Sequence, residues 1–130
     1  MTTLFKVCTY NILSSKLANA VSYPDLAPEV LDRQVRYEKL QQELLELIEE
    51  NYVICLQEVS SEWKNQLIPF FINHQYHLIY SSYGNRFNDY MGVGIAFPTT
   101  MDLLQVRILK PVNSKRWVEE PPRSKLNHRA

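Results

Sequence analysis

Two short apolar segments constrain the fold most. Residues 5–13 (FKVCTYNIL) and 52–59 (YVICLQEV) are rich in β-branched and aromatic side chains, and such near-continuous apolarity is typical of strands covered on both faces. Between them, apolar side chains recur at three- to five-residue steps over residues 29–50, which indicates an amphipathic helix. A strand, a helix and a strand joined by short links predict a βαβ unit with parallel strands and a right-handed crossover.

The sequence after these segments adds one helix and further strands. Residues 61–73 have an apolar face that predicts a second helix, and residues 76–82 predict a third strand, which a GNRFND turn follows. Residues 92–97 and 103–109 predict a hairpin around a Pro-Thr-Thr turn. Prolines interrupt a polar sequence over residues 111–130, so we expect an irregular, disordered tail there.

The composition is that of an ordinary globular chain. Of the 130 residues, 45% are hydrophobic and 22% are charged, which argues against disordered and fibrous classes. No apolar run approaches the roughly 20 residues that cross a bilayer, and the N-terminus lacks the pattern of a secretory signal. We therefore expect no membrane span and a cytoplasmic or nuclear location. Acidic residues predominate between residues 25 and 62 and basic residues after residue 100, without the basic stripe of a dedicated nucleic-acid-binding module.

Polar side chains stand at the ends of the first two predicted strands. Asn11 lies near the end of the first and Glu58 near the end of the second. Because ligands gather at the carboxyl ends of parallel strands, we expect these side chains to converge at one rim of the sheet. A carboxylate and an amide oxygen suit magnesium, which keeps several waters and takes few protein ligands. Alternatively, Asn11 only turns the chain and Glu58 only caps the next helix, which is the commoner role of such residues taken singly.

The same segments resemble a known family. CTYNIL (8–13) and CLQEV (55–59) are separated by a loop with Tyr-Pro (23–24) and Ala-Pro (27–28) pairs, and MGVGIAF (91–97) follows. This order and spacing resemble the N-terminal part of the exonuclease–endonuclease–phosphatase family. The closest branch is that of the carbon-catabolite-repression deadenylases with nocturnin and Angel. The resemblance implies the N-terminal portion of a two-sheet α/β sandwich, incomplete, as a partial domain over residues 1–110.

The resemblance also implies a chemistry. Glu58 would be the principal ligand of Mg²⁺ (or Mn²⁺), and Asn11 would bind the metal or the phosphate; both would be catalytic. Such enzymes hydrolyse phosphoesters by in-line attack of water, with the metal neutralising charge on the phosphoryl oxygens. RNA or another polynucleotide is the favoured substrate, and phospholipids or inositol phosphates are alternatives.

The sequence departs from the family in its second half. The family's Asp-x-Asn and Ser-Asp-His motifs are absent, and Met-Gly-Val-Gly stands where the deadenylases have Asp-Gly-Cys-Ala. The chain is thus expected to be the N-terminal fragment of a metal-dependent hydrolase, and the isolated chain to be inactive. The alternatives are a noncatalytic truncated product acting as a binding or interaction half-domain, with possible self-association, and an unrelated small α/β domain.

Four further pairs of side chains are weaker candidates. They are His74 with His77, Arg86 with Asn88, Ser14 with Ser15, and Cys8 with Cys55. The histidines have the spacing of metal ligands on one helical turn but lack a third ligand. The arginine and asparagine could contact a phosphate or a base, although a plain turn is favoured. The serines have no partnering histidine, and the cysteines are expected to be buried small hydrophobes.

Overall fold

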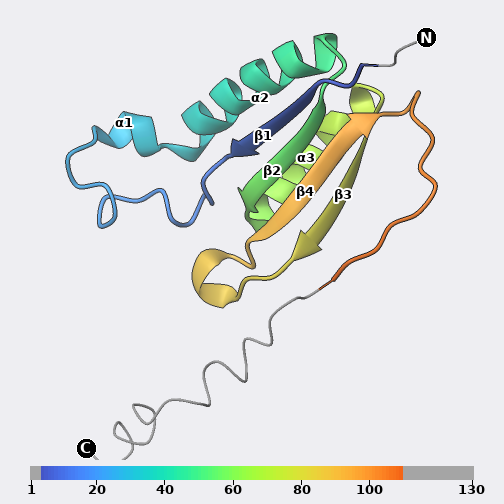
Figure 1. Ribbon diagram of the computed structural model, residues 1–130. Coiled ribbons are helices and arrows are strands. Elements are labelled where there is room, and N and C mark those ends of the chain that lie inside the picture. The colour runs from blue at the N-terminus through green and yellow to red at the C-terminus, as the bar shows by residue number, and fades with distance from the viewer. Residues whose placement is uncertain (1–3, 110–130) are drawn as a thin grey trace, which may run out of the picture.

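One four-stranded sheet organises the part of the chain that the computed structural model describes, residues 4–109 (Figure 1). Its strands lie in the order β1-β2-β4-β3. β1 and β2 are parallel, whereas β4 is antiparallel to both β2 and β3. The bounds are β1 Val7–Asn11, β2 Val53–Val59, β3 Tyr76–Ser82 and β4 Gly92–Pro98. The prediction that the first two strands are parallel is confirmed, and so are the predicted bounds of the third strand. The predicted α/β class is confirmed as well.

The helices differ from the prediction at one point. They are α1 Pro28–Leu31, α2 Arg33–Glu49, α3 Ser61–Asn73 and the short 3-10 helix η1 Arg86–Asn88. The single helix predicted over residues 29–50 is wrong, because Asp32 adopts an extended conformation between α1 and α2. Its carboxylate accepts hydrogen bonds from the backbone N–H groups of Gln34 and Val35 at 3.0 and 3.1 Å, which starts a new helix.

Helices α2 and α3 cover one face of the sheet and enclose the core. Trp63 and Phe71 of α3, Leu44 of α2 and Ile54 of β2 are fully buried there. Phe70 is also buried, so the apolar face predicted for residues 61–73 packs in the core. No helix within residues 4–109 is long and apolar enough to cross a membrane.

The opposite face of the sheet is partly open, so the prediction that the first strand is covered on both faces is wrong. Exposed and half-buried residues alternate along β1. The strand register places Thr9, Cys55, Ile95 and Ile79 in one row across this face. Ile95 remains 47% exposed, and Cys55 is a half-buried free thiol rather than a buried one. No second layer covers this row within the described residues.

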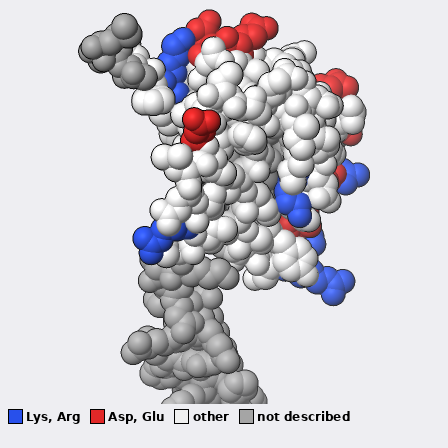
Figure 2. Space-filling model, turned by 90° about the vertical axis from the view of Figure 1, so that its right-hand side faces the viewer, with Lys and Arg blue, Asp and Glu red and all other residues white. Residues whose placement is uncertain are grey.

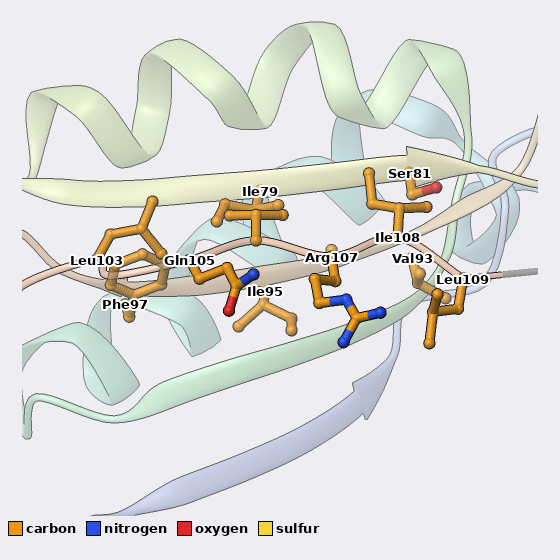
Figure 3. Close-up of a pocket in the computed structure, with 12 residues that line it drawn as sticks. Ile79, Ser81, Val93, Ile95, Phe97, Leu103, Gln105, Arg107, Ile108 and Leu109 are labelled. Atoms are coloured by element: carbon orange, nitrogen blue, oxygen red, sulfur yellow. The ribbon is translucent and has the colours of Figure 1, made fainter.

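Residues 103–109 lie along the open face instead of forming a hairpin with 92–97. They are not a strand, and together with β3 and β4 they line a cavity of about 490 Å³ (Figure 3). The predicted hairpin is wrong because β4 already pairs on both sides, with β2 and β3, and a strand has only two hydrogen-bonding edges. The predicted tail, 111–130, lies outside the described residues.

We predict that this open face makes the purified chain associate. Viewed from the side on which residues 99–109 lie, the middle of the surface carries few charged side chains (Figure 2), and exposed apolar patches favour association. Ile95→Lys is expected to shift the chain toward monomer in sedimentation velocity. Ile72→Lys, at a 62% exposed position of α3, is the control and is expected to leave the association state unchanged. A monodisperse wild-type monomer with a sharp, cooperative melting transition would contradict this prediction.

Candidate functional site

Asn11 and Glu58 meet at one rim of the sheet, as their positions in the sequence predicted. The side-chain amide of Asn11 donates a hydrogen bond from Nδ2 to Glu58 Oε1 at 3.0 Å. Asn11 is the last residue of β1, and Glu58 is the last but one of β2. The turn containing η1 lies at the same end of the molecule, between the end of β3 and the start of β4 (Figure 1). A loop and two strand ends therefore surround the pair.

A β-bulge directs Glu58 to this rim. Ile54 and Leu56 point into the core, so strict alternation along β2 would bury Glu58 there as well. Instead, the register with β4 shifts between Leu56 and Val59, and Glu58 takes a left-handed backbone conformation with φ of 56°. Val59 fills the core position in its place. Left-handed backbone at a residue other than glycine costs roughly 1–3 kcal/mol and is found mainly at functional sites.

The Glu58 carboxylate is only half satisfied. Oε1 accepts the bond from Asn11, whereas Oε2 is buried and has no hydrogen-bond partner among the described residues. A buried carboxylate oxygen without a partner is costly. A hard divalent cation, which prefers oxygen ligands, would satisfy it. The residues present therefore fit a metal at this position.

Asn11 is held in a fixed orientation by the chain that follows it. Its Oδ1 accepts a hydrogen bond from Leu13 N at 3.0 Å. The Leu13 carbonyl in turn accepts bonds from Arg36 Nη2 at 2.8 Å and from Trp63 Nε1 at 3.0 Å. In this arrangement the amide NH₂ faces Glu58, so Asn11 acts as a donor that orients the carboxylate. The same group could donate to a phosphate oxygen.

Arg36 is a supporting residue that the sequence did not single out. It contacts the carbonyls of both Ile12 and Leu13, and its guanidinium lies 5.3 Å from the ring centroid of Trp63. Burial lowers the pKa of Arg36. Its position four and eight residues before Leu40 and Leu44, the buried residues of α2, was the available signal. Residues four apart share one helix face, and a charged residue is rarely buried without a partner.

The serine pair and Asn88 of the GNRFND turn have structural roles. Ser14 Oγ donates to the Asn88 carbonyl at 3.1 Å, and the hydroxyls of Ser15 and Ser60 lie 2.9 Å apart. Asn88 Oδ1 accepts bonds from two backbone N–H groups, at Asn85 and Met91, so its side chain stabilises the turn. The Ser14–Asn88 hydrogen bond joins the loop after β1 to the loop before β4. The Ser15–Ser60 contact joins the loop after β1 to the start of α3.

The two histidines do not form a metal site. His74 Nδ1 lies 2.8 Å from the Phe70 carbonyl, and its ring packs on that phenylalanine. His77 packs on Phe97, with ring centroids 5.2 Å apart. Among residues 4–109, no three His, Cys, Asp or Glu side chains gather as a metal site would require.

Comparison with known proteins finds matches among the solved structures. Neither a family model nor a curated protein sequence matches the chain. Among the solved structures that do match is ANGEL2, a 2',3'-cyclic phosphatase in complex with adenosine-2',3'-vanadate. The TM-score is 0.63 and the identity 28%, over 72% of this chain and 27% of that chain. The chain thus spans about a quarter of the length of the structure that it matches.

This match supports the relation to the exonuclease–endonuclease–phosphatase superfamily that the YN and QE motifs indicate. It also agrees with the expectation of a partial α/β fold, since most of this chain superposes on a small part of a larger molecule. The fold relation rests on a match over 72% of this chain rather than on isolated residues.

Proposed function

We propose that this chain is the N-terminal part of a magnesium-dependent phosphoesterase that hydrolyses RNA or another polynucleotide. Asn11 and Glu58 belong to its metal and phosphate site. The proposal rests on the Glu58 carboxylate. A bulge turns this group toward the rim, and Asn11 donates a hydrogen bond to its Oε1 at 3.0 Å. Its Oε2 is buried without a partner among the described residues and can bind a cation. The similarity to a phosphatase that binds an adenosine-2',3'-vanadate supports a phosphoester substrate.

The roles of the two residues differ. Glu58 would hold Mg²⁺ (or Mn²⁺) through Oε2, because that oxygen, unlike Oε1, has no partner among the described residues. Asn11 would keep the carboxylate in place and donate from Nδ2 toward a phosphate oxygen. A bound magnesium ion supplies neutralisation of phosphoryl charge and lowers the pKa of a bound water. The water-activating carboxylate and the histidine–aspartate pair of the family would have to come from residues that this chain lacks.

A noncatalytic binding half-domain is the second candidate. The open sheet face around Ile95 favours it, because an apolar surface that the described chain leaves uncovered is suited to another polypeptide. In that case the Asn11–Glu58 pair would bind metal weakly or not at all.

Metal binding distinguishes these candidates. We expect the purified chain to bind Mn²⁺ in a titration followed by electron paramagnetic resonance, and Mg²⁺ to displace it. Glu58→Gln should lower the affinity at least about tenfold, since it removes the charged ligand. Glu46→Gln, at an exposed position of α2, is the charge-matched control and should bind like the wild type. Equal Mn²⁺ binding by Glu58→Gln and the wild type would refute the proposal.

A further inference from the structure

The loop beside the candidate site exposes three aromatic side chains. Tyr83 is 56% exposed, Phe87 78% and Tyr90 50%. They fall within eight consecutive residues, between the end of β3 and the start of β4. Aromatic residues contribute most when they are buried against a partner, and clustered exposed ones mark binding surfaces. No contact of the core uses these three rings.

The loop that carries these rings has a fixed shape. Asn85 and Asn88 cap η1 reciprocally through side-chain and backbone hydrogen bonds. Asp89 anchors the loop to the start of α3: its carbonyl accepts from Ser61 N at 2.8 Å, and its carboxylate accepts from Glu62 N at 3.0 Å. A side chain at Gly84 would collide with Asn88 Oδ1, because a Cβ there would lie only 2.3 Å from that atom. The aromatic side chains therefore project from a rigid support.

The loop adjoins the Asn11–Glu58 pair. Lys16, which follows β1 by a few residues, donates from Nζ to the Arg86 carbonyl at 2.9 Å. The Ser14 hydroxyl bonds the Asn88 carbonyl. Burial raises the pKa of Tyr83, and the negative charge of Glu58 raises it further, so these two residues are electrostatic neighbours. Tyr83 thus lies near the place where a phosphate would bind, and Phe87 and Tyr90 belong to the same loop.

Apart from the Glu58 carboxylate, the exposed charges around the loop that have no ion-pair partner among the described residues are positive. The Asp89 carboxylate is held at the N-terminus of α3, and Glu62 pairs with Arg33 at 2.8 Å. The exposed Arg86 guanidinium makes no hydrogen bond or ion pair within residues 4–109. Arg86 and Lys16 can therefore attract a phosphate backbone. Exposed rings beside free cations are the arrangement that binds single-stranded nucleic acid.

We propose that Phe87 and Tyr90, with Tyr83, form a platform on which the bases of a single-stranded RNA stack, while Arg86 and Lys16 contact its phosphates. The inference rests on the proposed polynucleotide substrate and adds to it the surface that holds the bases. Stacking is tolerant of sequence because every base has a π-face. The platform thus predicts affinity for single strands without a strong base preference.

The test is binding of a short fluorescein-labelled oligoadenylate RNA by the 130-residue chain, measured by fluorescence anisotropy in EDTA at fixed salt. An abasic strand of the same length is the second probe. The wild type should bind the base-bearing strand about 5- to 100-fold more tightly than the abasic one. Phe87→Ala should remove much of this difference, and Phe87→Trp should keep it. Ile72→Ala, an exposed apolar residue of α3, should bind like the wild type.

Equal binding of the two strands by the wild type, or an undiminished difference in Phe87→Ala, would overturn the platform. Because Phe87 is exposed, its variants should retain the wild-type melting temperature, which keeps a loss of binding interpretable. Because the RNA-binding assay contains EDTA and therefore no free metal ion, its result does not depend on the proposed metal site. Loss of Mn²⁺ binding in Glu58→Gln together with equal strand affinities would leave the metal site standing and refute only the platform.

Discussion

Purified residues 1–130 are expected to hydrolyse phosphodiesters no faster than magnesium-containing buffer alone. The structure brings together one carboxylate and one amide, and residues 4–109 contain no group of three His, Cys, Asp or Glu side chains placed to hold a metal. The sequence has neither of the family motifs that would supply a general base and a histidine–aspartate pair. Because catalytic groups act as a unit, loss of some of them commonly costs several orders of magnitude in rate.

The assay would use an oligoadenylate, adenosine 2',3'-cyclic phosphate and a chromogenic diester as three separate substrates. Glu58→Gln serves as the control for contaminating nucleases, because it should leave any background rate unchanged. Magnesium-dependent turnover that disappears in Glu58→Gln would contradict the prediction. It would mean that the two residues at the rim catalyse without the missing motifs.

Replacement of Trp63 is expected to have the largest effect on stability. The side chain is fully buried, stacks on Tyr37 with ring centroids 5.8 Å apart, and donates from Nε1 to the Leu13 carbonyl at 3.0 Å. Trp63→Ala should lower the free energy of unfolding by about 3–5 kcal/mol. Small domains have only about 5–15 kcal/mol in total, so the variant should lose a large fraction of its stability. Urea unfolding followed by circular dichroism measures the change.

Trp63→Phe separates packing from the hydrogen bond. It keeps an aromatic ring in the core but removes the donor to Leu13, which should cost about 1–3 kcal/mol because a buried carbonyl loses a partner. Arg36 still bonds the same carbonyl, so the loss should lie toward the lower end. A change below about 1 kcal/mol in Trp63→Ala would show that this residue does not organise the core.

The sequence predicted the elements whose signals are local. The parallel strands around Cys8 and Ile54 and the third strand follow from runs of apolar residues, and the structure contains both. The meeting of Asn11 and Glu58 followed from one topological rule, that parallel strands end at the same rim. The type of these three strands and the ends of the third could therefore be predicted from composition and spacing alone.

Features that depend on tertiary pairing were missed. The residues 103–109 have the apolar pattern of a strand, but β4 has no free edge to accept them. The break at Asp32 depends on a capping geometry that competes with continued helix. The bulge at Glu58 depends on the register between β2 and β4, which no local pattern encodes. Arg36 was missed because its partners are backbone carbonyls of a distant loop.

The location of a bound cation tests directly whether Asn11 and Glu58 form a metal site. Substoichiometric Mn²⁺ added to ¹⁵N-labelled protein broadens the nuclear magnetic resonance signals of nearby groups. If the metal site lies at the rim, the broadening should be strongest at the Asn11 side-chain NH₂ and at the backbone amides of Glu58 and Tyr83. The broadening should disappear in Glu58→Gln. Broadening centred instead on the acidic surface of α2, around Glu46 and Glu49, with the Asn11 amide unaffected, would contradict a metal site at the rim.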